Sequence, residues 1–299
     1  MTKLEFYPGL HQPSDTRHFP RAFVSVNRLK KRKADIDVQR WIMDSGAFTE
    51  ISIHGRHTLS VDAYADQIVR WARCGELVAA CTQDYMCESF ILDLQTRRQE
   101  EDLEEYWRSE WDEEGSAIFD REPELWEIEE KEERRLTPRD HQEMTVDRYV
   151  KLKEAVEARG CDTYLLPVLQ GFTPQEYVDC IDLYEKAGHL PQDAYVGVGS
   201  VCKRNSNPAA ILEVLGAILK RRPDLRLHGF GLKITALGNP EVRAMLASAD
   251  SMAWSTAARH ERNRLKKIGG DWEAAFSPND WRAAAAYAER VKQLIDKDL

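Results

Sequence analysis

The stretch TYLLPVLQGFTPQEYVDCIDLYEKAGHLPQDAYVGVGS, residues 163–200, contains a complete strand–helix–strand unit. It opens with the apolar run TYLLPVLQG and closes with AYVGVGS, and neither run alternates strictly between apolar and polar residues. Continuous apolar runs are typical of strands that are covered on both faces. Between them, Thr173 and Pro174 are typical of a helix start, and Gly188 of a helix end. This stretch therefore predicts a βαβ unit with parallel strands.

The same alternation extends over the rest of the chain, without an internal repeat or a linker that would divide it. Further strands are predicted at AFVSV (22–26), WIMDSG (41–46), ELVAACTQD (76–84), RLHGFGLK (226–233) and SMAWST (251–256). Further helices are predicted over residues 60–74, 145–159, 208–222, 240–249 and 278–298, the last being a C-terminal helix. Seven strands alternating with helices in a chain of 299 residues favour one domain, a closed (β/α)8 TIM-type barrel, over an open sheet.

An acidic segment, residues 89–143, interrupts this alternation after the third strand. Within it, residues 100–133 hold 17 Asp or Glu and three Lys or Arg, a local charge of −14. Aromatic residues such as Tyr106, Trp107 and Trp126 are interspersed with the acidic ones. We interpret the segment as a helical insertion packed on the barrel, in the position of a lid; the alternative is a charged loop.

Composition limits the class of protein. Hydrophobic residues make up 42% of the chain, which is enough for a full core. No apolar run approaches the roughly 18 residues of a membrane helix, and the N-terminus lacks a signal pattern. Six scattered cysteines indicate a reducing compartment, and their spacing matches no zinc site. The sequence therefore predicts a cytoplasmic protein without a membrane partner or a bound metal.

Charge is unevenly distributed in a way that bears on the partner. The net charge of −9 becomes +5 when the −14 of residues 100–133 is set aside. Basic clusters lie at residues 30–33, 203–204, 221–222 and 259–262. Such clusters neutralise backbone phosphates in nucleic-acid-binding proteins, or are simply solvated helix ends.

Polar residues and glycines gather where the predicted strands end. These strand ends read Asp44-Ser45-Gly46, Asp84, Gln170-Gly171, 197–200 (GVGS), His228-Gly229 and Gly231. The carboxyl ends of parallel strands form the rim at which α/β barrels assemble their active sites. Glycine lets a substrate approach the backbone closely, and Asp and Gln supply directional hydrogen bonds. We therefore expect a functional site at this rim.

Several of these stretches resemble the tRNA-guanine transglycosylase superfamily. DSGAF (44–48) is similar to its DSG(G/S)F signature, and VLQG (168–171) to its (I/V)VQG strand end. DSMAWSTAAR (250–259) resembles the DSASY…AR pattern in which the leading aspartate is the nucleophile. Together with VGSVCKR (198–204), these motifs are similar to the deazapurine DNA modification (DpdA) branch, which acts on DNA.

The resemblance implies cleavage of an N-glycosidic bond, with Asp250 as the nucleophile and Asp44 as the second acid, which moves a proton to or from the base. It also implies that the target base leaves the helix stack before it reacts. The residues expected to contact this base are Phe48, Asp84, Gln170, Gly171, Gly199 and His228, with Phe48 and His228 on its faces. The residues expected to contact the nucleic-acid backbone are Lys203, Arg204 and Arg259.

The sequence also departs from the superfamily. No cysteine follows Cys202, so the zinc site of the queuosine-type enzymes is not expected, and no cofactor is predicted. The additional tRNA-binding domains of the archaeal branch have no counterpart after the barrel. These departures favour DNA over tRNA as the polymer, with a free deazapurine base as a possible second substrate.

Four functional hypotheses follow from the sequence. The first is exchange of guanine in DNA for a deazapurine. The second is a hydrolytic DNA glycosylase that removes a modified base and leaves an abasic site, for instance in defence against phage. The third is an inactive barrel that only binds nucleic acid or a partner. The fourth is a hydrolase for small phosphorylated metabolites that uses residues 197–200 as a phosphate loop.

Overall fold

A computed structural model of the protein describes residues 3–97 and 135–297, and it shows a mixed α/β fold in which strands and helices alternate. The strands are β1 (Glu5–Pro8), β2 (Arg21–Ser25), β3 (Arg40–Asp44), β4 (Glu76–Cys81), β5 (Leu165–Leu166), β6 (Val168–Leu169), β7 (Tyr195–Val198), β8 (Arg226–Gly229) and β9 (Ser248–Ser251). The helices are η1 (Pro13–His18), α1 (Val26–Leu29), α2 (Ala47–His54), α3 (Val61–Ala72), α6 (Pro138–Glu157), α7 (Pro174–Lys186), η2 (Val201–Arg204), α8 (Pro208–Arg221), α9 (Ile234–Leu237), α10 (Pro240–Ala244), α11 (Ala253–Lys267) and α12 (Trp281–Asp296).

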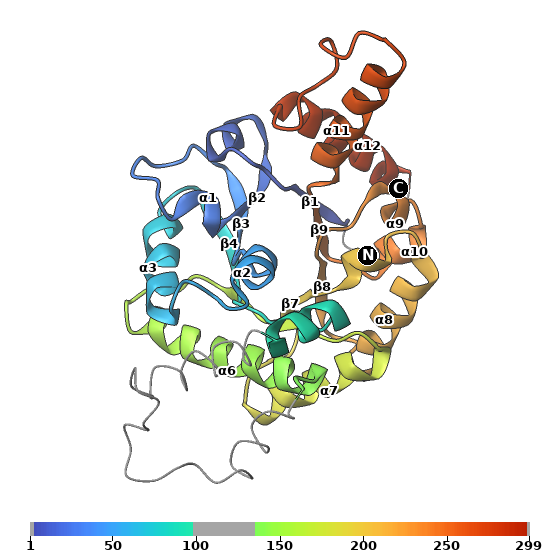
Figure 1. Ribbon diagram of the computed structural model, residues 1–299. Coiled ribbons are helices and arrows are strands. Elements are labelled where there is room, and N and C mark those ends of the chain that lie inside the picture. Colours follow the sequence, from blue (N-terminus) through green and yellow to red (C-terminus); the bar gives the residue numbers. More distant parts are fainter. Residues whose placement is uncertain (1–2, 98–134, 298–299) are drawn as a thin grey trace, which may run out of the picture.

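The strands form two parallel sheets. One sheet has the order β1-β9-β8-β7-β6 and the other the order β2-β3-β4-β5. The two sheets meet at both margins: a parallel bridge joins Gly9, just after β1, to Phe23 of β2, and only Pro167 separates β5 from β6. The strands surround a common centre, and α3, α6, α7 and α8 lie outside them (Figure 1). The carboxyl ends of all strands therefore face the same side of the molecule.

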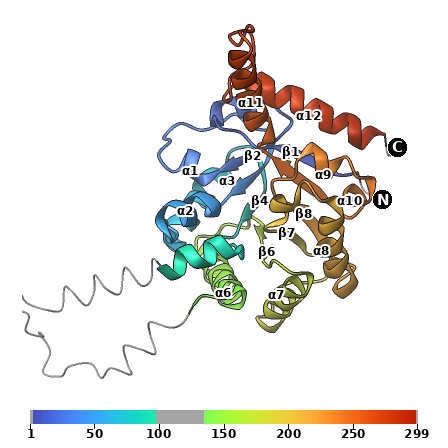
Figure 2. The ribbon, with the colours of Figure 1, turned by 45° about the vertical axis from the view of Figure 1, so that its right-hand side comes forward.

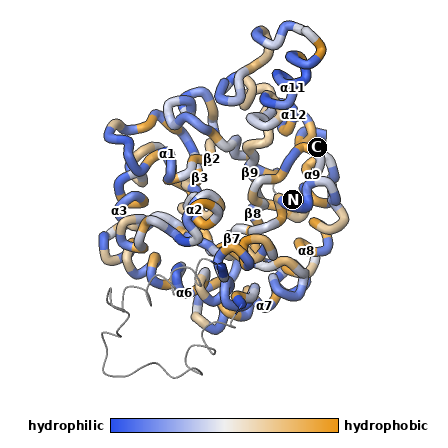
Figure 3. Tube along the Cα trace, in the orientation of Figure 1, coloured by the Kyte–Doolittle hydropathy of each residue, from blue (hydrophilic) through white to orange (hydrophobic). Residues whose placement is uncertain are grey.

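Apolar side chains fill two layers. The larger cluster lies between the strands and the surrounding helices and includes Trp41, Trp71 and Tyr184, which are fully buried. A smaller cluster lies between facing strands and is made of Tyr7, Phe23, Ile42, Ala79, Cys81, Leu166 and Tyr195. Figure 3 shows that α8 is largely hydrophobic whereas α11 is largely hydrophilic, in agreement with its basic sequence. Helix α11 runs beside α12, away from the strands (Figure 2).

Local signals explain where the main helices begin. Thr173 and Glu176 form a capping box at the start of α7, in which each side chain accepts a hydrogen bond from the other residue's backbone N–H. Thr137 and Asp140 form the same motif at the start of α6. Helix α6 therefore begins at Pro138, two turns before the start predicted from the sequence.

Two strands differ from the predictions. The last strand is Ser248–Ser251, not 251–256, and the following residues begin α11. The apolar Met252-Ala253-Trp254 misled the prediction, because Trp254 packs from the helix and donates a hydrogen bond to the Gly9 carbonyl, 2.8 Å away. The strand β1 was missed, because its four residues carry little signal until they pair with β9.

The acidic insertion lies mostly outside the described residues, so its predicted helical structure and lid position stay predictions. Its first part, residues 89–97, is helical, and its last part belongs to α6. The two ends of the segment lie together, because the backbone N–H of Leu136 donates to the Thr96 hydroxyl at 3.1 Å. Among residues 3–97 and 135–297, no helix is long and apolar enough to cross a membrane.

Candidate active site

Asp250 is buried in β9 near the carboxyl end of the strands, with an exposed fraction of 5%. Two donors are directed at its Oδ1 atom: the backbone N–H of Gly231 at 2.9 Å and Nε2 of His228 at 3.3 Å. Both come from the neighbouring strand β8 and the turn that follows it. The turn after β8 and the His228 side chain therefore fix one carboxylate oxygen of Asp250, while Oδ2 accepts no hydrogen bond from the described residues.

A chain of polar side chains continues behind His228. Its Nδ1 lies 2.7 Å from the Ser248 hydroxyl and 3.2 Å from the Tyr195 hydroxyl, which are 2.6 Å from each other. All three side chains are buried, and the imidazole is completely so. Because a buried polar group needs a partner, this chain explains how a histidine is tolerated between the rings of Phe23 and Phe230.

Asp44 ends β3 and is held close enough to Asp250 for the two charges to interact. Burial raises the pKa of Asp44 to about 6, and the negative charge of Asp250 acts in the same direction. Hydrogen bonds from the Gly46 backbone and the Ser25 hydroxyl act against this rise. The turn is possible because Gly46 has φ of 74°, in the left-handed region, where a Cβ would also collide with Asn27. The two predicted acids therefore lie near each other at the carboxyl edge of the strands.

Asp84 and Gln170 form a pair between β4 and β6. The Gln170 amide donates to Oδ2 of Asp84 and its carbonyl accepts from the Ser200 hydroxyl at 3.2 Å, which fixes the orientation of the amide. Burial raises the pKa of Asp84 to about 7, with the charges of Asp44 and Glu88 contributing. Near neutral pH this carboxyl thus changes between proton donor and acceptor.

Gly199 leaves the space that this pair occupies. A Cβ added at Gly199 would lie 2.3 Å from Nε2 of Gln170. Gly199 and Gln170 come from neighbouring strands, and the Tyr177 hydroxyl donates to the Gly199 carbonyl at 2.7 Å. Gly171 is similarly tight, since its Cβ would lie 3.0 Å from that of Glu176. Both predicted glycines are therefore required by close packing next to the site.

We expect Gly199→Ala to lower kcat/KM by about tenfold to a hundredfold, because the methyl group displaces the flexible end of Gln170 and not the backbone. The thermal midpoint should change little. The matched control is Gly216→Ala in α8, where nothing lies within 4 Å of the added Cβ. This control should keep full activity and gain about 0.5–1 kcal/mol of stability. Steady-state kinetics of the base exchange that the resemblance implies, together with thermal unfolding, check both variants. Normal activity of Gly199→Ala would contradict the expected role of Gly199.

A second prediction concerns Asp84 and pH. Its folded pKa of about 7 lies above the ordinary value of 3.8, so the folded protein holds more protons between these pH values. Stability therefore decreases as pH rises from about 4 to 7. Asp84→Asn removes this effect and should be more stable than the wild type at pH 8 by about 1–2 kcal/mol. Urea unfolding at pH 5 and pH 8 measures the free energy of unfolding of the variant and of the wild type. If the difference between the two proteins is the same at both pH values, the explanation is refuted.

The two residues predicted to face the base differ in accessibility. Phe48, in the first turn of α2, is 51% exposed and available for stacking. His228 is completely buried, with Phe23 stacked near its face at 5.7 Å and Phe230 against it at 4.8 Å. Its ring therefore has no free face toward the site, and only Nε2 points to Asp250.

The predicted backbone-contacting cations lie at the same edge as the carboxylates. Lys203 and Arg204 are in η2, which follows β7, and Arg259 is exposed on α11, which follows β9. Arg28 in α1 joins them, because it and Arg259 both lie close enough to His11 to lower the pKa of that imidazole, in addition to the effect of burial. Within the described residues, these four cations have no salt bridge to a carboxylate.

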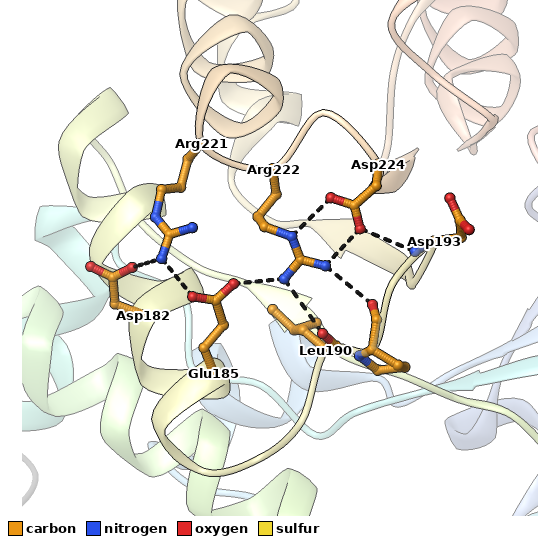
Figure 4. A network of polar contacts seen from close by, with 8 residues as sticks. Asp182, Glu185, Leu190, Asp193, Arg221, Arg222 and Asp224 are labelled. Atoms are coloured by element: carbon orange, nitrogen blue, oxygen red, sulfur yellow. Dashed lines mark hydrogen bonds and ion pairs between the residues drawn. The ribbon is translucent and has the colours of Figure 1, made fainter.

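The basic pair Arg221-Arg222 belongs to a different environment at the opposite edge of the strands. Arg222 binds Glu185 and Asp224, both at 2.6 Å, and Arg221 binds Asp182 at 2.8 Å and Glu185 at 2.5 Å (Figure 4). Lys30 is likewise engaged, with the buried Glu50 at 3.0 Å. Arg221, Arg222 and Lys30 therefore hold helix ends and loops together, and the charges of these three side chains are already neutralised.

Sequence reasoning missed several site residues. These are Arg28, Tyr195, Ser248 and the two exposed rings Phe90 and Phe172. They carry no motif and are recruited only by tertiary contacts. Gly231 was expected at the rim as a strand-end glycine, and its backbone N–H donates to Asp250. No group of three or more His, Cys, Asp or Glu in the described ranges is placed to hold a metal ion.

Parallel strands with helices outside, and acidic and amide side chains at their carboxyl ends, define the class as an α/β protein with a polar candidate site at the strand ends. The sequence matches the family model described as deoxypurine in DNA protein A, DpdA, over residues 2–106 and 110–291. The chain therefore belongs to the DpdA family, and this membership implies a role in deazapurine modification of DNA. No curated protein matches the sequence significantly.

Proposed function

We propose that this protein cleaves the N-glycosidic bond of a base in DNA through a nucleophilic Asp250 and exchanges guanine for a deazapurine. The observation that carries the proposal is the convergence of Asp44 and Asp250, from β3 and β9, close enough for one charge to act on the other. The family membership supports DNA and a deazapurine as the substrates.

We also infer that the two sheets are parts of one closed (β/α)8 TIM-type barrel. The Gly9–Phe23 bridge supports closure at one margin, and the single residue Pro167 between β5 and β6 supports it at the other. If β5 and β6 are counted as one interrupted strand, the ring contains eight strands. Closure places the carboxyl ends of β3 and β9 on one rim, which is what the reaction requires.

In the proposed reaction, an oxygen of Asp250 forms a bond to C1′ of the target nucleotide as the bond from C1′ to the base nitrogen breaks. The leaving base takes the electron pair and receives a proton from Asp44. An incoming deazapurine then gives its proton to ionised Asp44, and its nitrogen attacks C1′ and releases Asp250. Atoms and charge balance over the cycle, and no cofactor is consumed.

The raised pKa of Asp44, about 6, suits this role, because a carboxyl with that value both donates and accepts a proton near neutral pH. Asp84 and Gln170 form the base-recognition pair, since together they offer a donor and an acceptor to the edge of an extruded base. Phe48 stacks on the base from α2.

His228 acts in this scheme as a positioning residue. With Asp250 ionised, Nε2 of His228 carries the proton and donates to Oδ1, so Nδ1 accepts from the Ser248 or Tyr195 hydroxyl. This chain, together with the Gly231 N–H, holds one carboxylate oxygen. The other oxygen is then the one available to C1′.

We expect His228→Leu to lower kcat by about tenfold to a hundredfold with little change in KM, since Asp250 keeps only the Gly231 N–H. His228→Gln, whose amide can replace the Nε2 donor, should recover part of the loss. Steady-state kinetics of both variants check this. If His228→Gln and His228→Leu lower kcat equally, the imidazole only packs in the core and does not position Asp250.

The hydrolytic alternative uses the same carboxylates, with water in place of the incoming base. The inactive-barrel alternative is disfavoured by the raised pKa of both Asp44 and Asp84, because strongly perturbed carboxyls in one site are typical of catalysis.

The deciding experiment incubates the protein with plain duplex and single-stranded DNA, with and without a free deazapurine, and identifies bases and nucleosides by mass spectrometry. Exchange gives guanine release that depends on the deazapurine, with equal incorporation. Release without incorporation, and alkali-labile sites, would show the hydrolytic reaction instead. An absence of both from folded protein would refute cleavage.

A further inference from the structure

Three phenylalanines lie exposed at the carboxyl edge of the strands and form what we call the aromatic rim: Phe48, Phe90 and Phe172. Their exposed fractions are 51%, 49% and 49%. They come from α2, from the helical residues 89–97 and from the loop before α7, so no single element presents them. Exposure of several large rings in one place costs free energy in a free protein and is typical of a binding surface.

Two neighbouring cations hold the rim together. Nζ of Lys203 lies 4.4 Å from the ring centre of Phe48 and 5.3 Å from that of Phe90. The guanidinium of Arg204 lies 4.6 Å from the ring centre of Phe172. Because Lys203 and Arg204 are consecutive, all three rings lie within reach of one short segment, η2.

The rim is continuous with the candidate site. Arg204 donates to the Ser200 carbonyl at 3.1 Å, and the Ser200 hydroxyl donates to Gln170 at 3.2 Å. Phe48 itself follows Asp44 by four residues. A polymer whose target base lies between Asp84 and Asp250 therefore passes over the rim with its next nucleotides.

Charge and ring chemistry together define what fits this surface. Within the described residues neither Lys203 nor Arg204 has a salt bridge to a carboxylate, in contrast to Arg222 at the opposite edge (Figure 4). Among these residues, Arg204 donates only to the backbone carbonyls of Ser200 and Phe172, so its charge is not neutralised. Cations without a carboxylate partner beside exposed rings match a strand that offers phosphates and unstacked bases. A paired duplex offers phosphates but no base faces, so it cannot use the rings.

We propose that the aromatic rim binds unpaired nucleotides next to the extruded base, with Phe90 and Phe172 as stacking platforms and Lys203 and Arg204 on the phosphates. This inference rests on the proposed function for its choice of DNA. It predicts that the preferred substrate is single-stranded or locally opened DNA, whose flanking bases are already free to stack.

The test measures fluorescence anisotropy of the Asp250→Asn variant with a labelled 12-nucleotide single strand, a perfect duplex and a duplex with a central mismatch bubble. We expect the single strand and the bubble to bind at least about tenfold more tightly than the perfect duplex. Phe90→Ala and Phe172→Ala should each weaken single-strand binding by about tenfold. A 2-aminopurine placed beside the target base should lose fluorescence when the DNA binds the Asp250→Asn protein. The loss of fluorescence should be smaller when that protein also carries Phe90→Ala or Phe172→Ala.

The matched control is Phe276→Ala. Phe276 is 43% exposed and has the Arg282 guanidinium 5.7 Å from its ring centre, but it lies between α11 and α12. Its removal should leave the affinity unchanged. For the cations, Lys203→Gln should reduce the slope of log affinity against log salt by about 0.7, while Lys220→Gln, exposed on α8, should not.

The outcomes separate this inference from the proposed function. If the wild type exchanges bases but binds duplex as tightly as single strand, or keeps its affinity in Phe90→Ala and Phe172→Ala, the rim proposal is overturned and the function stands. If the rim variants lose single-strand binding while the wild type shows no base release, the surface assignment holds and the chemistry fails. An equal loss of single-strand affinity in Phe276→Ala would show a general effect of removing an exposed ring, and it would also overturn the rim proposal.

Discussion

We expect Asp250→Asn to abolish the proposed base release and exchange, with a rate at least about 10⁴-fold below that of the wild type, and to leave DNA binding intact. The amide keeps the size of the carboxylate and can still accept from Gly231, so the site retains its shape. It cannot form a stable bond to C1′, because a neutral amide is a far weaker nucleophile. Single-turnover base release with mass spectrometry measures the loss.

A covalent intermediate gives a second readout for the same prediction. Denatured wild-type reactions should contain a DNA–protein adduct that is absent from Asp250→Asn. The control is Asp224→Asn at the opposite edge, which breaks the ion pair with Arg222 and should lower the thermal midpoint without changing the rate of the folded protein. Turnover or an adduct in Asp250→Asn would remove the nucleophile assignment.

Asp44→Asn is expected to lower the rate by about 10²–10⁴-fold and to change its pH dependence. In the proposed reaction, base release requires protonated Asp44, whose pKa burial raises to about 6, so we expect the wild-type rate of this step to decrease as pH rises above about 6. The Asn variant cannot donate a proton in this way and should show no such decrease near pH 6.

Single-turnover rates between pH 5 and pH 8 check this dependence. Asp84, with a pKa raised to about 7, titrates in the same range, so Asp84→Asn is the necessary control. This control should slow the reaction but keep the decrease above pH 6. If the decrease persists in Asp44→Asn and disappears in Asp84→Asn, the acid is Asp84 and the assignment of Asp44 is wrong.

Most elements of the fold follow from the sequence, because their signals are local. Thr173, Pro174 and Gly188 mark α7, and the apolar run around Val196 marks a buried strand. The parallel arrangement follows from the order of strands and helices and is confirmed by the strand pairs. The closure into a barrel that we propose is not a local feature, because its support comes from the bridge between Gly9 and Phe23.

The errors have a common physical origin. Strand β9, Ser-Ala-Asp-Ser, is polar in sequence yet buried, because β1 and β8 satisfy its backbone on both sides. A strand that gains its stability entirely from its neighbours carries no hydrophobic pattern of its own. The prediction therefore moved to the apolar residues that follow, which begin α11.

For the candidate site, the sequence by itself determined three of the chemical groups and their edge: Asp44, Asp84 and Gln170 end predicted strands, and parallel strands bring such ends together. Asp250 was indicated by the family resemblance alone, and the tertiary structure places it near the carboxyl end of β9. Only the tertiary structure decided how each group behaves. It buries His228 behind Asp250, pairs Arg222 with carboxylates, and leaves Lys203 to the exposed rings. Burial and ion pairing arise between segments far apart in the chain, and they set whether a charge is neutralised, shifted in pKa or free to bind.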